Sequence, residues 1–282
     1  MTVLSKRKTG TQNPSKPLRI AFTNIRGLRS NFSSLETYLF QASPDVLAIS
    51  ETHLTSDVAD EDFSVPGYLP IKRKDSLNGK HGLAVYLKET LPIARHEELE
   101  MPDSPFMCFR LSLLYSTSYL FVLYRSPANQ DCSVLDNISN SIDQAITLHP
   151  SANIYVCGDF NVHHKDWLPN HNLTDQAGRD AHAFAVSHDL TQMVNFITRI
   201  PDNARHNPST LDLFYHPNLI FAKCLLRHLL ANLTMFLYLL IFLLARQQLM
   251  IPLFIGLYIA MIVVIGTVSG TSFVMFPGMK YS

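Results

Sequence analysis

The sequence has few cysteines, and no two of them lie close together in the chain. Among 282 residues there are four cysteines, far apart in the chain, at Cys108, Cys132, Cys157 and Cys224. Such spacing indicates neither a disulfide framework nor a zinc site, so we expect a reducing compartment. An apolar signal-peptide core is also absent after the N-terminus, so the Asn-X-Ser/Thr triplets are interpreted as chance matches rather than glycosylation sites.

The sequence also lacks a net charge, because 23 Lys and Arg residues balance 23 Asp and Glu residues. An overall electrostatic field that would attract nucleic acid is therefore not indicated. The first 19 residues nevertheless carry five bases and no acid. Their polar composition predicts a disordered basic arm over residues 1–17. Such an arm either attracts phosphates, acts as a nuclear address or is only a solvated tail.

The segment Asn153–Asn161 is the strongest local signal in the chain. Its apolar run of β-favouring residues ends at Gly158 and then carries Asp159 and Asn161, which is typical of a buried strand that delivers polar groups at its end. If the chain stays extended, Asp159 and Asn161 share one side-chain direction, because the period of a strand is two. The alternative is an ordinary core strand followed by a turn at Gly158.

Other apolar runs predict further strands with polar groups near their ends. Leu18–Thr23 leads to Asn24, Val46–Ser50 leads to Glu51, and a last strand, Ser209–Phe214, carries Asp212. The other expected strands are Gly82–Leu87, Met193–Phe196 and a hairpin formed by Phe106–Leu114 with Ser118–Tyr124. Helical spacing is found after Phe32, with Ser33 and Glu36 placed as a capping box, over Val134–Leu148 and over Asp180–His188. Together these elements predict a layered α/β or α+β sandwich, in which the polar strand ends can converge.

The ordered set of these segments resembles the endonuclease/exonuclease/phosphatase superfamily, and within it the endonuclease domain of Jockey-like non-LTR retrotransposons. The matching segments are Asn24-Ile-Arg-Gly-Leu28, Ile49-Ser-Glu-Thr-His53, Gly82-Leu-Ala-Val-Tyr86, Leu123-Tyr-Arg-Ser-Pro127, Gly158-Asp-Phe-Asn161 with His164 and Trp167, and Ser209-Thr-Leu-Asp212. Each is weak alone, but they follow one another in the family's order. The resemblance implies a four-layered α/β sandwich over residues 18–220 and a phosphodiesterase that uses Mg²⁺ or Mn²⁺ and acts on DNA.

The resemblance also implies roles for single residues. Glu51 would be the main metal ligand, Asn24 its neighbour in the metal shell, and Tyr124 a contact to the scissile phosphate. Hard carboxylate and amide oxygens suit Mg²⁺, which neutralises charge on a phosphate under attack. The alternatives are that Glu51 caps a turn and that Tyr124 is a core aromatic residue.

The remaining roles concern the other end of the implied site. Asp159 would activate or orient the attacking water, Asn161 would steady the oxyanion, and Asp212 would orient a catalytic histidine. Relatives carry that histidine in a late Ser-Asp-His element, which this sequence lacks. The loss of a general acid or base typically costs about 10²- to 10⁴-fold in rate, so we expect an impaired enzyme. Asp212 could alternatively lie on an exposed strand face.

Residues 221–282 form a hydrophobic tail in place of the missing element. Two almost uniformly apolar runs, Leu229–Ala245 and Leu249–Val268, contain 17 and 20 residues, close to the roughly 20 that span a membrane. One interpretation is a helical hairpin that anchors the protein in a membrane. The other, which the three-residue connection favours, is that the reading frame has left the element's coding sequence.

The sequence therefore predicts a truncated, retrotransposon-derived, metal-dependent endonuclease-like domain with a non-homologous tail. A nuclear or cytoplasmic location follows from the resemblance, and a membrane location follows if the tail inserts. No protein partner can be inferred. Two alternatives stay open: a phosphodiesterase of the same superfamily that hydrolyses a small molecule or lipid, and an inactive remnant that binds nucleic acid or membrane.

Overall fold

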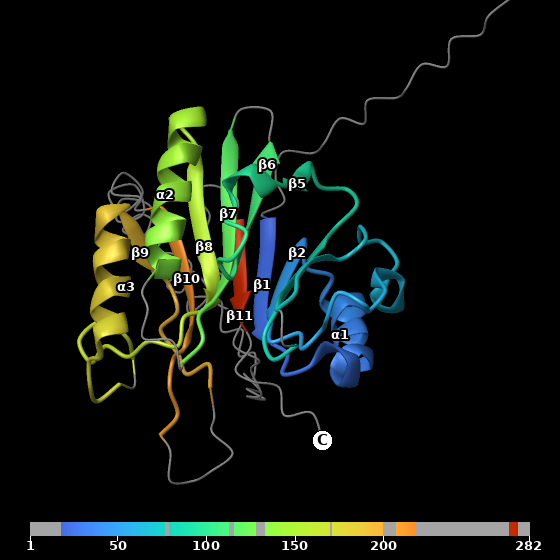
Figure 1. Ribbon diagram of the computed structural model, residues 1–282, viewed down its shortest axis with the longest axis horizontal. Helices are drawn as coiled ribbons and strands as arrows, with labels where there is room; N and C mark the ends of the chain where they lie inside the picture. Colours follow the sequence, from blue (N-terminus) through green and yellow to red (C-terminus); the bar gives the residue numbers. More distant parts are fainter. Residues whose placement is uncertain are drawn as a thin grey trace, which may run out of the picture.

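The computed structural model describes residues 18–76, 79–112, 116–127, 133–169, 171–199, 207–217 and 271–275. Two β-sheets pack face to face, and helices lie on the outer face of each sheet (Figure 1). The predicted four-layered α/β sandwich is thus confirmed. The basic arm and both candidate membrane spans lie outside the described residues.

The first sheet has five strands in the order β11-β1-β2-β4-β3. Their bounds are Leu18–Asn24 for β1, Val46–Ser50 for β2, Lys72–Lys74 for β3, Leu83–Leu87 for β4 and Thr271–Met275 for β11. Strand β1 is parallel to both of its neighbours, β2 and β11, whereas β4 is antiparallel to β2 and β3. All residues of β2 and β4 are buried, as expected for strands covered on both faces.

The second sheet has six strands in the order β5-β6-β7-β8-β10-β9. Their bounds are Ile93–Arg95 for β5, Phe106–Ser112 for β6, Thr117–Tyr124 for β7, Asn153–Asp159 for β8, Leu190–Gln192 for β9 and Asp212–Pro217 for β10. The predicted hairpin is present as the antiparallel pair of β6 and β7. Strands β7 and β8 are parallel, and α2 connects them along the chain.

Helix α1 (Leu28–Ala42) covers the first sheet, and α2 (Ser133–Leu148) and α3 (Gln176–Ser187) cover the second (Figure 1). Two short 3₁₀ helices, η1 (Asp60–Phe63) and η2 (Glu97–Leu99), lie in connections. Three apolar clusters fill the spaces between the four layers. Leu35 and Leu39 of α1 pack on the first sheet, side chains such as Phe22 and Val122 meet between the sheets, and Ile138 and Ile142 of α2 pack on the second sheet.

The predicted start of the first helix was wrong. Helix α1 begins at Leu28, five residues before the proposed capping box at Ser33, and no side chain caps its N-terminus. The backbone N–H groups of Gly27 and Leu28 instead donate to the carbonyl oxygens of Glu51 and Thr52, at 2.7 and 2.8 Å. Tertiary backbone contacts therefore satisfy donors that a capping side chain would otherwise bind. Phe40, placed on the buried face by the sequence pattern, is 86% exposed.

Two predicted strands in the second half of the chain are displaced. The strand expected at Met193–Phe196 lies earlier, as β9, and the strand expected from Ser209 begins only at Asp212. Residues Ser209 to Leu211 are held instead by Thr198 and Arg199: the backbone N–H groups of both residues donate to the Ser209 carbonyl oxygen.

Strand β11 was not predicted, because its residues lie in the hydrophobic tail. It pairs with β1 in parallel register from Leu18 opposite Thr271 to Phe22 opposite Met275. Because β11 pairs with β1, this edge of β1 is not left as an unpaired edge strand. Among the described residues, no helix is long and apolar enough to cross a membrane.

Candidate active site

The polar residues singled out in the sequence gather where strands of the two sheets end. In the first sheet Asn24, at the end of β1, is in register with Ser50, at the end of β2. In the second sheet Tyr124 of β7 is in register with Asp159 of β8, and Asp159 is in turn opposite Asp212 of β10. The parallel pairing aligns the end of β1 with that of β2 and the end of β7 with that of β8, and a side-chain hydrogen bond between Asn24 and Asp159 brings the two sets of ends together.

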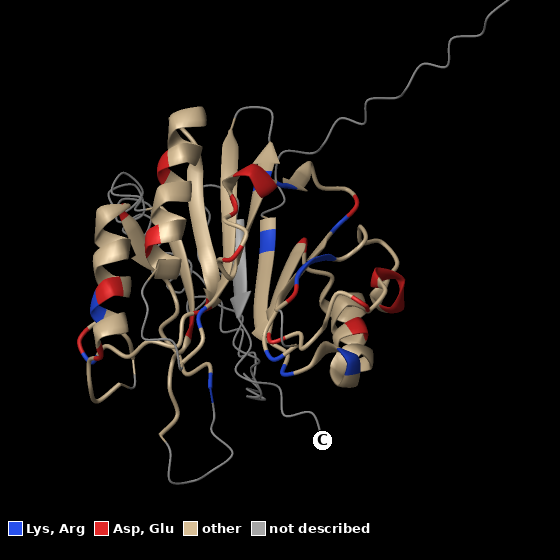
Figure 2. Ribbon diagram, in the orientation of Figure 1, with Lys and Arg blue, Asp and Glu red and all other residues tan. Residues whose placement is uncertain are grey.

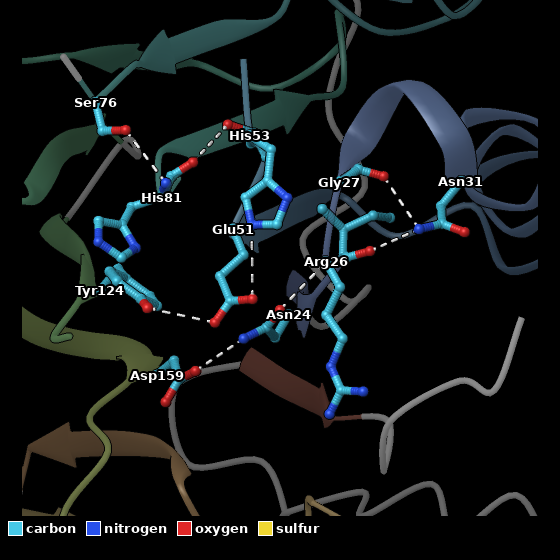
Figure 3. Close-up of polar contacts among 12 residues, drawn as sticks. Asn24, Arg26, Gly27, Asn31, Glu51, His53, Ser76, His81, Tyr124 and Asp159 are labelled. Atoms are coloured by element: carbon cyan, nitrogen blue, oxygen red, sulfur yellow. Dashed lines mark hydrogen bonds and ion pairs between the residues drawn. The ribbon is translucent and has the colours of Figure 1, made fainter. Parts of the chain in front are cut away.

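Asn24 and Asp159 connect the two sheets. The Nδ2 of Asn24 donates a hydrogen bond of 2.9 Å to Oδ2 of Asp159 (Figure 3). Asp159 is only 4% exposed, and its Oδ1 is buried without a hydrogen-bond partner among the described residues. Burial raises the pKa of this carboxyl group to about 7, and the nearby Glu51 raises it too, whereas the hydrogen bond from Asn24 opposes the rise.

Glu51 follows β2 in a left-handed backbone conformation, with φ of 53°. Its Oε1 accepts a hydrogen bond of 3.3 Å from the Tyr124 hydroxyl group, and its Oε2 lies 3.8 Å from Nε2 of His53 (Figure 3). Burial, with the negative charge of Glu51 beside it, raises the pKa of the Tyr124 phenol. Tyr124 therefore remains a hydrogen-bond donor at neutral pH. Positive φ angles at Glu51 and also at His53 mark the type of strained turn that often occurs at functional sites.

A glycine sets the position of Asp159. Gly158 lies between Leu123 of β7 and Leu213 of β10 in the sheet register. A Cβ atom at this position would clash with the carbonyl oxygen of Leu123. The glycine thus allows a close backbone approach directly before the acid, and the fully buried Phe160 fixes the chain directly after it.

Asn161 does not share a side-chain direction with Asp159 in the way that the sequence led us to expect. Strand β8 ends at Asp159, and Asn161 has a left-handed φ of 48°, so the chain is not extended between the two residues. Asn161 Nδ2 donates to the Arg125 carbonyl oxygen at 2.8 Å, and Arg125 Nη1 donates to the Asn161 carbonyl oxygen at 3.1 Å. Asn161 is therefore held beside the end of β7, two residues after the acid.

Asp212 is placed by a residue that the sequence analysis did not single out. The Oγ1 of Thr198 accepts hydrogen bonds from the backbone N–H groups of Leu211 and Asp212, at 3.0 and 3.1 Å. Burial and the neighbouring Asp159 raise the pKa of the Asp212 carboxyl group well above its ordinary value. Among the described residues, no histidine is hydrogen-bonded to this carboxylate. Thr198 lies in an irregular segment without periodicity, so no sequence signal could have found it.

The donor set at the site fits a hydrated Mg²⁺ ion. Glu51 offers a carboxylate and Asn24 an amide oxygen, which accepts a 3.2 Å hydrogen bond from the Arg26 N–H group and keeps a second lone pair. Among the residues that the structure describes, no group of three or more His, Cys, Asp or Glu side chains could hold a metal. Mg²⁺ needs no such cage, because it keeps several waters and takes one or two carboxylates from the protein.

The surface around the site carries both signs of charge. Figure 2 shows acidic and basic residues interspersed at the lower end of the sheets, the end toward which β11 points in Figure 1. Of the three carboxylates at the site, Glu51 is partly exposed, with 23% of its side chain accessible, whereas the other two are buried. Asp159 and Asp212 are 4% and 7% exposed, respectively.

Comparisons with known proteins support the superfamily suggested by the sequence. Residues 118–230 match the family model described as endonuclease-reverse transcriptase. A comparison with curated protein sequences finds no match. Solved structures with a similar fold include the endonuclease domain of TRAS1, a telomere-specific non-LTR retrotransposon. It is 13% identical, with a TM-score of 0.57, and the match covers 71% of this chain and 85% of that chain.

Two further solved structures share the fold. The AP endonuclease LMAP from Leishmania major is 17% identical, with a TM-score of 0.60, and the match covers 77% of this chain and 84% of that chain. The 3′-5′ exonuclease NExo from Neisseria meningitidis is 14% identical, with a TM-score of 0.56, and the match covers 72% of this chain and 88% of that chain. The class of fold is therefore that of the endonuclease/exonuclease/phosphatase superfamily. Residues 118–230 are similar to the endonuclease-reverse transcriptase family, and the fold is shared with the TRAS1 endonuclease domain.

Proposed function

We propose that this domain is a Mg²⁺-dependent endonuclease that hydrolyses a phosphodiester bond of DNA. The observation that carries the proposal is the connection of four strand ends by side-chain hydrogen bonds. Asn24 is bonded to Asp159 across the two sheets, and Tyr124 is bonded to Glu51. A carboxylate of raised pKa, a phenol and a second carboxylate thus meet at one end of the sandwich. The TRAS1 endonuclease domain and the DNA-bound NExo structure support DNA as the substrate class.

Glu51 and Asn24 would hold the metal ion, which supplies positive charge to a phosphate under attack. Glu51 is suited to this role because 23% of its side chain is exposed, so that one carboxylate oxygen can face the substrate. The Tyr124 hydroxyl group remains protonated at neutral pH, and its single O–H, which donates to Glu51 in the structure, can turn to a phosphate oxygen when substrate binds. These two residues would therefore fix the phosphate before it reacts.

Asp159 would accept the proton of the attacking water. A general base is most effective when its pKa is close to the working pH, and burial places the pKa of Asp159 at about 7. Asn161 retains one amide N–H beyond the one that it donates to Arg125, because a carboxamide has two. That second N–H is available to an oxygen that becomes negatively charged. Asp212 lies opposite Asp159 in the sheet, and burial together with the negative charge of Asp159 raises the pKa of the Asp212 carboxyl group, so that Asp212 holds its proton more readily beside the ionised base.

The absence of a Ser-Asp-His element from the sequence supports a second candidate, an inactive remnant that still binds nucleic acid. The two candidates differ in one measurable property, the cutting of DNA. The test is nicking of supercoiled plasmid by the purified full-length chain with Mg²⁺, and again with a chelator. We expect slow, Mg²⁺-dependent nicking that Glu51→Gln reduces at least about 10²-fold.

The matched control is Glu36→Gln, which removes an exposed carboxylate from α1 and should leave nicking unchanged. Two outcomes would decide against the proposal. One is an absence of nicking in the presence of retained DNA binding, which selects the remnant. The other is nicking that survives unchanged in Glu51→Gln, which would point to a contaminating nuclease or another site.

A further inference from the structure

His81 lies against the candidate site although the sequence analysis gave it no role. It precedes β4 and is tied by its backbone to the turn that carries Glu51. The His53 N–H group donates to the His81 carbonyl oxygen at 2.9 Å, and the Thr52 N–H group donates to the Gly82 carbonyl oxygen at 3.3 Å. The His81 N–H group donates to Ser76 Oγ at 3.2 Å (Figure 3). The backbone of His81 is thus fixed relative to Glu51.

The imidazole ring of His81 lies on the phenol ring of Tyr124. The two ring centroids are 5.1 Å apart and the planes differ by 29°, which is a stacked arrangement (Figure 3). The Nδ1 atom of His81 is buried without a hydrogen-bond partner among the described residues. The ring position is therefore determined by the aromatic contact rather than by a polar contact through Nδ1. Stacked rings with offset planes are a favourable geometry for aromatic pairs.

This contact restricts the movement of the hydroxyl group that reaches Glu51. Tyr124 is the last residue of β7, and its side chain is 3% exposed and packs in the apolar cluster between the two sheets. A ring packed against one face of the phenol limits its rotation and holds the hydroxyl oxygen at 3.3 Å from Oε1 of Glu51. Without the imidazole, the phenol could take other side-chain rotamers.

The fit of the backbone around His81 explains why the contact is well defined. Gly82 has φ of 104°, and a Cβ atom at this position would clash with Oγ1 of Thr52. The two loops can approach this closely only because Gly82 lacks a side chain. This close approach of the Gly82 loop to the Thr52 loop brings His81 to the face of the Tyr124 ring.

We propose that His81 is a positioning residue, which holds the Tyr124 phenol at Glu51 through the face of its imidazole ring. The inference rests on the proposed function, because Tyr124 is the group proposed to contact the phosphate. This positioning role differs from a direct role in proton transfer. If only the ring face matters, an aromatic ring without nitrogen atoms should perform the role of the His81 imidazole.

The kinetic experiment compares His81→Ala with His81→Phe in the full-length chain. We expect His81→Ala to lower kcat for plasmid nicking roughly tenfold or more, because small displacements of positioned groups are costly, with little change in KM. His81→Phe keeps a ring face and should stay within about twofold of the unsubstituted protein. Equal losses in the two variants, or no loss in His81→Ala, would overturn the proposal.

The matched control is His96→Ala, which removes a histidine from another tyrosine, Tyr119, at a centroid distance of 5.9 Å in a different part of the fold. It should leave kcat unchanged. The thermal unfolding midpoint of each variant is measured alongside, and His81→Gln serves as a second replacement without a ring if His81→Ala does not fold. A loss of kcat in His81→Gln with recovery in His81→Phe supports the ring-face role, and the reverse order overturns it.

A second measurement does not need enzymatic activity. In protein labelled with ¹³C-tyrosine, the ring signals of Tyr124 are identified by their disappearance in Tyr124→Phe. His81→Ala should change these signals by more than the loss of the imidazole ring current alone, with broadening or new signals as the phenol takes further rotamers, and His81→Phe should restore a single set of signals. If the unsubstituted protein does not nick DNA, the proposed function fails, while these spectra still decide whether His81 positions Tyr124. Unchanged Tyr124 signals in His81→Ala would refute the inference.

Discussion

The side-chain amide of Asn24 donates a 2.9 Å hydrogen bond to the carboxylate of Asp159, and this bond joins the end of β1 in one sheet to the end of β8 in the other. Asp159 is 4% exposed, so it has little access to water as an alternative partner. The bond therefore has a role in stability as well as in the site, because a buried charge without a partner is costly.

We predict that Asn24→Ala destabilises the protein by about 1–3 kcal/mol, the range for loss of a hydrogen bond to a buried charged group. Most of this loss should disappear when Asp159 is already replaced by Ala, which has no side-chain acceptor. A double-mutant cycle, measured by chemical denaturation at pH 8, reports the coupling directly. Asn140→Ala, on an exposed part of α2, is the control and should change stability by less than about 0.5 kcal/mol. Additive effects of the two substitutions would contradict the prediction.

The raised pKa of Asp159 predicts that stability falls as the pH rises. The folded-state pKa is about 7, and the ordinary value is 3.8. Between these two values the folded protein binds more protons than the unfolded chain does, so the free energy of unfolding decreases with increasing pH. The stabilising contribution is fully present below about pH 4 and is lost once the pH passes about 7. Asp212, whose pKa is also raised, adds to the same slope.

The measurement is denaturant unfolding at several pH values from 5 to 8, in the presence of a chelator. Asp159→Asn should flatten the pH dependence and be more stable than the unsubstituted protein at pH 8. The same substitution should abolish most of the nicking activity, so stability and activity change in opposite directions. Asp136→Asn, an exposed acid in the first turn of α2, should leave the slope unchanged. A stability that increases between pH 5 and 7 would show that the sign is wrong.

The strand ends were predictable from sequence because each apolar run stops at or directly before a polar residue of the candidate site. Asn24 and Asp159 are the last residues of β1 and β8, and Glu51 directly follows β2. The same reasoning failed at Asn161, where a left-handed residue turns the chain. Such a turn depends on the tertiary bonds to Arg125, which no periodicity reports.

Residues that act through long-range contacts could not be predicted at all. Thr198 and His81 lie in irregular segments, and each meets the site through a contact that only the folded chain creates. The first helix shows the same limit, because its N-terminal donors are satisfied by Glu51 and Thr52, far from the helix in sequence. The local capping pattern was consequently a poor guide to its start.

Thr198 should be more important for the site than its position in a loop suggests. Its hydroxyl oxygen accepts two backbone hydrogen bonds, and the residue is 2% exposed. Thr198→Val keeps the shape but leaves the N–H groups of Leu211 and Asp212 without an acceptor, at a cost of roughly 1–3 kcal/mol for each buried donor. Thr198→Ser retains the hydroxyl group and is the matched control.

The expected result is a lower unfolding midpoint for Thr198→Val, together with reduced nicking, because Asp212 is no longer held beside Asp159. Thr198→Ser should retain most of both properties. Equal stability of the Val and Ser variants would mean that the two backbone donors find other acceptors, and the proposed support of Asp212 would then be incorrect.

The last prediction concerns the strand that the sequence placed outside the domain. Strand β11 pairs with β1 over Leu18 to Phe22, and β1 carries Asn24 two residues beyond this pairing. Removal of residues 271–282 would leave the backbone N–H and C=O groups of this edge of β1 unpaired, which promotes edge-to-edge association. Removal of residues 276–282 alone keeps β11 and is the matched control.

We therefore expect the longer deletion to lower the free energy of unfolding, with each lost ladder hydrogen bond contributing about 0.5–1.5 kcal/mol. Amide hydrogen exchange should become faster over Leu18 to Phe22, and the protein should aggregate more readily. The shorter deletion should match the full-length chain in all three measurements. If the two deletions behave alike, the pairing of β11 does not stabilise β1. The stability of the Asn24 end of the site would then come from β2, the other neighbour of β1 in this sheet.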